Sequence, residues 1–190
     1  MLSVYNQMKC LKKLGYYTGK LDSIKGPLYQ KAVKDLQNDY FTRAKDKDGL
    51  YGKNTDILLV NLYRIKLYTK NFKVEEFKCG CKGNCTGYPA KLSTNLLKNL
   101  QKVRDKYGPV TITSGERCEK YNNSLTGSSK TSYHLKGKAV DFKIDKCSTE
   151  SGRKGVMRFL KTLPNYHYTY CNLGNSHPNM GKAIHYDVRE

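Results

Sequence analysis

The sequence of 190 residues predicts an α+β fold: a small three-helix N-terminal part, then an α+β part with a central antiparallel sheet. Two patterns carry this prediction. Up to residue 68, apolar residues recur at the spacing of amphipathic helices. Beyond it, one more helical stripe is followed by short alternating or β-branched segments, which are typical of half-buried strands. We therefore expect two domains, at residues 1–68 and 69–190.

Three helices are predicted in residues 1–68. Their apolar stripes are Val4, Met8, Leu11 and Leu14; Ala32, Val33, Leu36 and Tyr40; and Ile57, Leu58, Val60, Leu62 and Ile65. Gly15 follows the first stripe directly, where a glycine commonly ends a helix.

Two similar turns precede the second and third helices. Residues 22–29 and 48–55 both begin with Asp, place an aliphatic residue third and a glycine fifth, and start 26 residues apart. We expect the Asp to start the turn, the aliphatic residue to fill a small core, and the glycine to take a positive φ before the helix. The similarity indicates a weak internal duplication.

The helix and turn pattern of residues 3–66 resembles the peptidoglycan-binding domain of bacterial and phage wall hydrolases. The resemblance implies that residues 1–68 bind the bacterial wall. Tyr16, Tyr17 and Tyr51 look exposed and could stack on sugars, and core packing is an equally weighted alternative for each.

The second part begins after a short polar connection at residues 67–74. An apolar stripe predicts a helix over residues 92–107, which Gly108 and Pro109 end. Val110-Thr111-Ile112-Thr113 is a strand by composition. It runs into Ser114-Gly115-Glu116-Arg117, and a polar loop then leads to His134.

The stretch from Ser132 to Asp141 carries the strongest chemical signal. It places a histidine in a loop and a carboxylate seven residues later on an alternating strand. His185, in the alternating segment at 183–188, is the best third partner for His134 and Asp141. Two histidines and one carboxylate with an open fourth position form the ligand set of a catalytic zinc. The alternative is a surface histidine and a strand aspartate that never meet.

Taken together, the S-G-x-R segment, the S-x-H-x-x-G-x-A-x-D stretch and the terminal His185-Tyr186-Asp187-Val188-Arg189 resemble the D-alanyl-D-alanine carboxypeptidase family of zinc peptidases, whose relatives include phage endolysin peptidases. The resemblance spans about residues 72–190. It implies that His134, Asp141 and His185 bind Zn²⁺, and that residues 69–190 are the catalytic domain.

Two further roles follow from this resemblance. Arg117 is expected to bind substrate or stabilise the oxyanion, with an ordinary salt bridge as the alternative. Many family members carry an acidic residue three positions before the last histidine, where this chain has Lys182. Asp187 shares a strand face with His185, so it is our candidate for general base or for orienting that histidine. His167 and His177 are second choices for the base.

Seven cysteines and no visible signal peptide predict synthesis in the cytoplasm, a reducing compartment. Cys79, Cys81 and Cys85 form a C-x-C-x-x-x-C cluster, which could hold a structural zinc with Cys118 or Cys147 as a fourth ligand. Because the spacing departs from C-x-x-C, free, partly buried thiols are the favoured interpretation.

The formal net charge of +19 predicts attraction to a polyanion, either nucleic acid or the phosphate polymers of a bacterial wall. Lysine predominates over arginine, and no nucleic-acid-binding motif is visible, so we expect no nucleic-acid partner. No apolar run is long enough to insert into a membrane. We expect a monomer.

The leading functional hypothesis is a zinc peptidase that cuts peptide bonds in peptidoglycan, delivered by its N-terminal domain. The absence of a signal peptide suits a phage endolysin that reaches the wall through a holin. A host D,D-carboxypeptidase or autolysin and a non-catalytic, zinc-containing wall-binding protein are the alternatives.

Overall fold

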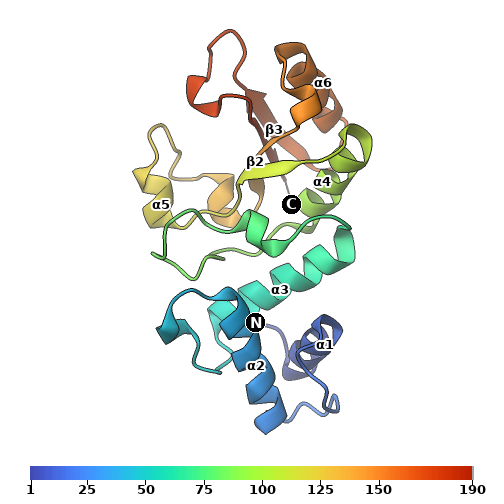
Figure 1. Ribbon diagram of the computed structural model, residues 1–190, viewed down its shortest axis with the longest axis vertical. Coiled ribbons are helices and arrows are strands. Elements are labelled where there is room, and N and C mark those ends of the chain that lie inside the picture. Colours follow the sequence, from blue (N-terminus) through green and yellow to red (C-terminus); the bar gives the residue numbers. More distant parts are fainter. Residues whose placement is uncertain (190) are drawn as a thin grey trace.

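A computed structural model describes residues 1–189 and shows an α+β fold, which confirms the predicted class (Figure 1). The helices are α1 (Val4–Leu14), α2 (Pro27–Tyr40), α3 (Lys53–Tyr68), α4 (Thr94–Tyr107), α5 (Glu119–Ser124) and α6 (Glu150–Lys161). The strands are β1 (Thr111–Ser114), β2 (Ala139–Lys143), β3 (Tyr166–Cys171) and β4 (Ile184–Val188). The short 3₁₀ helices are η1 (Ala44–Asp46), η2 (Val74–Phe77), η3 (Tyr133–Lys136), η4 (Asp145–Cys147) and η5 (Pro178–Met180).

The two predicted turns before α2 and α3 form the same hydrogen bonds. Asp22 Oδ1 accepts from Ile24 N, and Asp48 Oδ1 accepts from Leu50 N, both at 2.9 Å. The prediction that Ile24 and Leu50 fill a core is wrong, since each is 67% exposed. The aspartate holds the turn through the backbone N–H two residues later, so the turn does not depend on burying the aliphatic side chain at that position.

The prediction of a positive φ at the glycine that starts each helix is also wrong. Gly26 and Gly52 have φ of −75° and −104°, which residues with side chains adopt without strain. The left-handed conformation occurs earlier in each turn, at Ser23 (φ 64°) and Gly49 (φ 77°). The chain therefore reverses one residue after the aspartate and is already extended where the helix begins.

The tyrosines proposed to stack on sugars differ in exposure. Tyr17 is only 5% exposed, and its hydroxyl donates to Lys20 O, so the prediction that it is exposed is wrong. Tyr16 and Tyr51 are half-buried, and their hydroxyls donate to Asp39 and Asp56. These contacts favour core packing for Tyr17 and anchored, partly covered rings for the other two.

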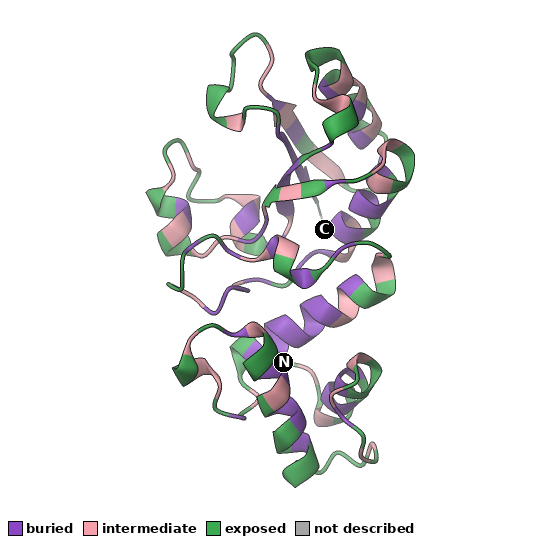
Figure 2. Ribbon diagram, viewed as in Figure 1, coloured by how far each residue is buried: buried purple, intermediate pink, exposed green. Residues whose placement is uncertain are grey.

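Helix α3 lies between the α1–α2 pair and the part that holds the sheet (Figure 1), and Figure 2 shows that most of its length is buried. Asn61 on this helix is fully enclosed. Its amide Nδ2 donates to Ala90 O and Glu116 Oε1, and its Oδ1 accepts from Leu92 N. Polar contacts therefore cross the expected boundary after residue 68.

The four strands pair antiparallel in the order β1-β2-β4-β3. Val140 pairs with Tyr186 on one face of the sheet, where Asn99 of α4 donates to the Tyr186 hydroxyl. Successive side chains alternate between faces, so the Asp141–His185 pair lies on the opposite face, away from α4. One face of the sheet thus packs on α4, and the other carries Asp141 and His185, which are also buried.

Within residues 1–189, no helix has both the length and the apolar character needed to cross a membrane.

Candidate metal centre

His134 lies in η3 and is 2% exposed. Its Nδ1 is 2.7 Å from the carbonyl oxygen of Gly115. A carbonyl only accepts, so Nδ1 carries the proton and Nε2 carries the lone pair. Burial lowers the pKa of His134, which keeps the ring neutral. Nε2 is buried without a hydrogen-bond partner, and such an orphaned atom is the feature expected of a metal ligand.

Two glycines of the sequence motifs allow this arrangement. At Gly115, a Cβ would lie 2.4 Å from Phe77 O, and at Gly137 it would lie 2.4 Å from Lys91 O. Gly137 also has a φ of 66°, which ends η3 directly before β2. Both positions need glycine because neighbouring backbone occupies the space of a side chain.

Asp141 and His185 face each other across β2 and β4. Asp141 Oδ1 is 2.7 Å from His185 Nδ1 and 3.5 Å from His134 Nε2. The ligand atoms of these three buried residues all lie within 4.8 Å of one another. The structure therefore brings together all three residues that the sequence singles out, and two imidazoles with one carboxylate suit Zn²⁺ with an open position.

The protonation states suit a cation at this place. Burial alone would raise the pKa of Asp141, but its histidine neighbours outweigh burial and lower it below the ordinary range. Burial opposes a charge on His185, yet hydrogen bonds to Asp141 and Asp187 raise the pKa of this histidine. The cluster thus holds an ionised carboxylate, whose charge Arg117 pairs on one oxygen and which protonated imidazole or a bound cation can balance on the other.

Asp187 accepts two hydrogen bonds from histidines. Its Oδ2 is 3.0 Å from His185 Nε2, and its Oδ1 is 2.6 Å from His167 Nδ1. These bonds outweigh burial and lower the pKa of Asp187. Since carboxylates only accept, both ring nitrogens of His185 donate, Nε2–H to Asp187 and Nδ1–H to Asp141. A cation held by His185 and Asp141 would take the place of the Nδ1 proton, while Asp187 kept Nε2–H and so fixed the ring orientation.

The pairing of His167 with Asp187 was not apparent from the sequence, where His167 is only a second choice for the base. The register between β3 and β4 shifts between Tyr166 and Tyr168, and this irregularity places His167 beside Asp187. The His167 ring also stacks on Tyr133, at 4.6 Å between centroids. Strand alternation alone does not reveal such a bulge.

Arg117 is anchored beside the cluster. Its Nη2 donates to Asp141 Oδ2 at 2.7 Å, and its Nε and Nη2 both donate to Ser114 Oγ. This is a salt bridge with a candidate metal ligand, so the salt-bridge alternative is present in the structure. Asp141 thus turns one oxygen toward the histidines and the other toward Arg117.

The remaining sequence candidates lie outside this group of contacts. Lys182 is exposed and places no carboxylate in the site. His177 contacts the ring of Tyr170, at 4.8 Å, and Tyr170 in turn stacks on His185. His177 is therefore separated from the candidate ligands by an aromatic ring.

Two histidines and a carboxylate buried together at one face of an antiparallel sheet could hold a divalent cation, and such ligand sets occur in metal-dependent hydrolases. The family model of peptidase M15 matches residues 70–171, more than half of the chain. The chain belongs to this family, and it is a peptidase. The matched region includes His134, Asp141 and Arg117, and it ends before His185. A search of curated proteins finds no match to this sequence.

Proposed function

We propose that the protein is a zinc metallopeptidase that hydrolyses peptide bonds in bacterial peptidoglycan, in the manner of an endolysin. The observation that carries this proposal is the unpartnered, buried Nε2 of His134 facing Asp141 and His185. Membership of the peptidase family supports the reaction type. Zn²⁺ held by these three residues would supply a bound water of lowered pKa and a Lewis acid for the scissile carbonyl.

Arg117 is proposed to contact the substrate. Its Nε and Nη2 are held by Ser114 and Asp141, while Nη1 forms no hydrogen bond within residues 1–189. Nη1 is therefore the group that can donate to the carbonyl oxygen as it becomes negative. The anchored guanidinium needs little reorganisation, which is the condition for effective oxyanion stabilisation.

Asp187 is proposed to orient His185 rather than to act as the base. Both of its carboxylate oxygens already accept from histidine N–H groups. A carboxylate engaged in this way fixes the tautomer of its histidine and has less capacity to take a proton from water. His167, which Asp187 holds through Nδ1, is then the candidate for the base, through its other ring nitrogen.

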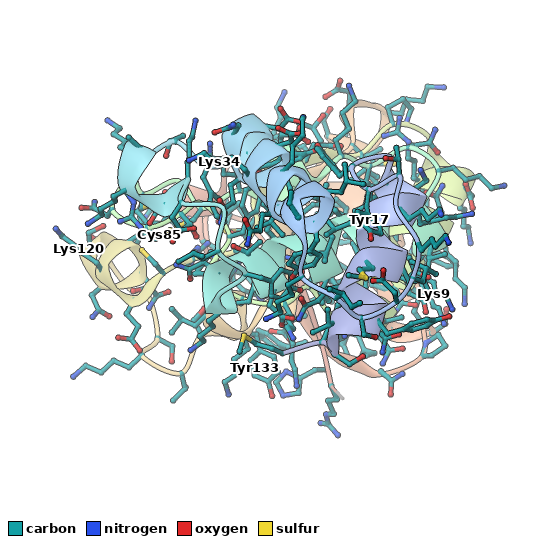
Figure 3. The ribbon with its side chains drawn as sticks, turned by 90° about the horizontal axis from the view of Figure 1, so that it is seen from below. Lys9, Tyr17, Lys34, Cys85, Lys120 and Tyr133 are labelled. Carbon is teal, nitrogen blue, oxygen red and sulfur yellow. The ribbon has the colours of Figure 1, made fainter. Side chains whose placement is uncertain are left out.

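Wall targeting is proposed for the three N-terminal helices. The support is the repeated turn before α2 and α3 and the large positive charge. Lys9, Lys34 and Lys120 project from separate sides of the molecule in Figure 3, so these three charges do not form one patch. Such a distribution favours diffuse attraction to anionic wall polymers over recognition of a defined nucleic-acid site.

The test is digestion of purified cell wall, followed by identification of newly formed amino and carboxyl ends. We expect new ends inside peptide stems or cross-bridges, their loss with a chelator, and their recovery on addition of Zn²⁺. The variant His134→Ala should produce none. Release of terminal D-alanine alone would instead indicate a carboxypeptidase, and wall binding without new ends would indicate a non-catalytic wall-binding protein.

A further inference from the structure

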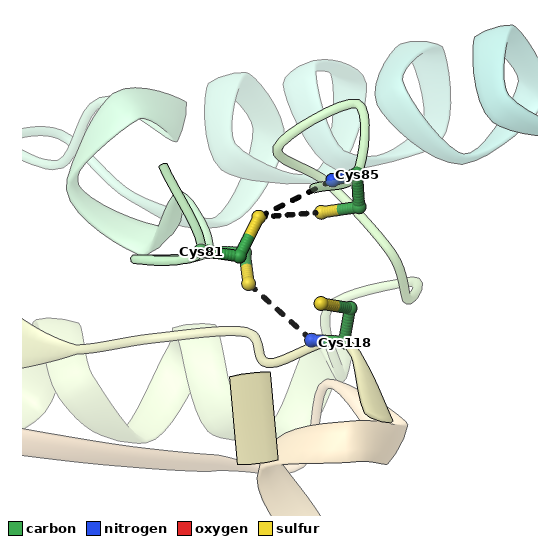
Figure 4. Close-up of side chains that lie close together, drawn as sticks. Cys81, Cys85 and Cys118 are labelled. Carbon is green, nitrogen blue, oxygen red and sulfur yellow. Dashed lines mark hydrogen bonds between the residues drawn. The ribbon is translucent and has the colours of Figure 1, made fainter. Parts of the chain in front are cut away.

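A second cluster of metal-ligating side chains lies apart from the histidine site. Cys79, Cys81 and Cys85 belong to the loop between η2 and α4, and Cys118 directly precedes α5. Their sulfur atoms all lie within 4.8 Å of one another. Figure 4 shows the sulfurs of Cys81 and Cys85, from one loop, and of Cys118, from another segment, turned toward a common centre.

These cysteines are not joined by disulfides. All seven cysteines are free, and the sulfurs of Cys81 and Cys85 are 3.4 Å apart, far beyond the bonded distance of about 2.05 Å. Cys79 and Cys81 are buried, while Cys85 and Cys118 are partly covered. Four thiols that converge without bonding leave a centre that their sulfurs surround.

Backbone N–H groups point at three of the four sulfurs. Cys118 N donates to Cys79, Cys85 N donates to Cys81, and Gly87 N donates to Cys85, each at 3.3 Å. N–H donors of this kind stabilise negative charge on sulfur, and the thiolate is the metal-binding form.

The short loop from Cys81 to Cys85 reverses the chain direction and thereby brings the two sulfur atoms close together. Lys82 and Gly83 both have positive φ, at 51° and 91°, which tightens the reversal between the two cysteines. Asn84 holds the loop through Nδ2, which donates to Cys81 O at 2.8 Å.

The surroundings of the cluster are cationic. Lys120 Nζ donates to Asn84 Oδ1, and Arg43 Nη1 donates to Asn84 O. The side chain of Lys78 packs against Gly87, where an added Cβ would lie 2.8 Å from its Cε. Four thiolates around one divalent cation carry a net charge of −2, which the neighbouring Lys78 and Lys120 favour, while Arg43 also pairs with Asp46.

We propose that Cys79, Cys81, Cys85 and Cys118 bind a structural Zn²⁺. Four cysteine ligands fill the tetrahedral coordination of zinc and leave no open position, so this site supports the fold and takes no part in hydrolysis. All-sulfur tetrahedral sites select Zn²⁺ over harder cations such as Mg²⁺ and Ca²⁺. The cysteine site stands on its own geometry and does not depend on the proposed function.

The cysteine site ties the loop after η2 to the segment that carries Arg117. Within this segment, Glu116 accepts from Ala90 N at 2.8 Å, and Arg117 N donates to His134 O at 3.2 Å. Cys118 then adds a link to Cys79 one residue further on. A metal at the cysteines would therefore fix the backbone on one side of Arg117, while Asp141 holds its side chain.

The first experiment measures zinc content of the full chain, purified under reducing conditions, for matched variants. We expect two zinc ions in the wild type, one in Cys118→Ser, one in His134→Ala and none in the double variant. Cys147→Ser is the matched control, since Cys147 is also free and partly covered, and it should keep two. Two zinc ions in Cys118→Ser would overturn the proposal.

The second experiment replaces zinc by Co²⁺ in the wild type, which does not require a variant to fold. Thiolate ligands give an intense charge-transfer absorption in the near ultraviolet that histidine and carboxylate ligands do not. We expect this band in the wild type and in His134→Ala. Its absence from the wild type, or a disulfide among these cysteines in the reduced, purified protein, would overturn the proposal. Wall hydrolysis tests the proposed function separately, since its failure leaves these cobalt results unaffected.

Discussion

A single hydrogen bond decides which nitrogen of His134 faces the candidate metal centre. Because Gly115 O can only accept, the ring must present its lone pair at Nε2, toward Asp141. Asp187 sets His185 in the complementary way, by accepting from Nε2 and leaving Nδ1 toward Asp141. At the scale of single residues, the hydrogen bonds from the two histidines to Gly115 O and Asp187 thus determine which ring nitrogen of each faces the site.

Arg117→Lys tests the role of the guanidinium. A lysine cannot reproduce the fork that contacts Ser114 and Asp141 and leaves Nη1 free. We expect kcat to fall by about 100-fold with zinc content unchanged, the magnitude of losing one oxyanion donor. The control is Lys120→Arg, at an exposed cation outside the site. Wild-type turnover in Arg117→Lys would assign this arginine a purely structural salt bridge.

Asp187→Asn separates an orienting role from a base. Loss of the carboxylate behind a histidine ligand weakens metal binding by about 10- to 100-fold. We therefore expect a weaker zinc affinity, measured by competition with a chelator, together with reduced turnover. Unchanged zinc affinity with abolished turnover would instead make Asp187 the base. His167→Gln, which removes the other partner of Asp187, should lower turnover and leave zinc affinity near the wild-type value.

The proximity of His134, Asp141 and His185 could be predicted from the sequence, chiefly through the family resemblance of their motifs, and the structure pairs Asp141 with His185 on the two inner strands. Their role as metal ligands remains our proposal. The partner of Asp187 could not be predicted, because the register shift that moves His167 has no signature in residue alternation. The prediction that Tyr17 is exposed was wrong because a polar sequence context does not show that the ring joins the apolar core while its hydroxyl donates to Lys20 O.

At the scale of elements, α3 is where sequence and structure differ most. Its apolar stripe predicts a helix, and α3 (Lys53–Tyr68) is present. Nine of its sixteen residues are buried, however, because it packs against both the α1–α2 pair and α4. An apolar stripe in the sequence predicts that one side of a helix is buried. It does not predict whether other elements also pack against the remaining sides.

Asp56 on α3 gives the fold a pH dependence. Its carboxylate accepts from Leu2 N and Tyr51 and pairs with Lys91 at 2.6 Å. Burial opposes ionisation, but these partners outweigh it and lower the pKa of Asp56. A lowered folded pKa contributes stability above the ordinary carboxyl pKa of about 3.9, and this contribution is lost as pH falls through the folded value.

We therefore expect Asp56→Asn to lower the free energy of unfolding by about 2 kcal/mol at neutral pH. The difference from the wild type should shrink in acid, below the ordinary carboxyl pKa. Urea unfolding at a series of pH values measures both. Asp35→Asn is the control, because Asp35 pairs with Lys31 on an exposed helix surface and should change little. A difference that stays constant into acid would contradict the account.

At the scale of the whole molecule, the N-terminal helices and the sheet share one apolar core. The cluster of buried residues runs without a break from Met8 of α1 to Val188 of β4. Asn61 adds three enclosed hydrogen bonds across the expected boundary. Wall binding and hydrolysis, if assigned to residues 1–68 and 69–190, would thus reside in parts that support each other.

Removal of residues 1–68 should therefore damage the remaining part. The fragment 69–190 would expose the side of α4 that contacts α3 and leave the backbone of Ala90 and Leu92 without its Asn61 partner. We expect it to aggregate, or to lose its cooperative thermal transition, even with excess zinc. A fragment that melts cooperatively near the temperature of the full chain would show that the two parts fold independently.

The most direct test of the central claim is an anomalous difference map, recorded at the zinc absorption edge from crystals of the full chain. We predict a peak at a coordination distance of about 2.0–2.1 Å from His134 Nε2 and His185 Nδ1, with Asp141 as the third ligand. A map from zinc-supplemented crystals with no peak among these three residues would contradict the account.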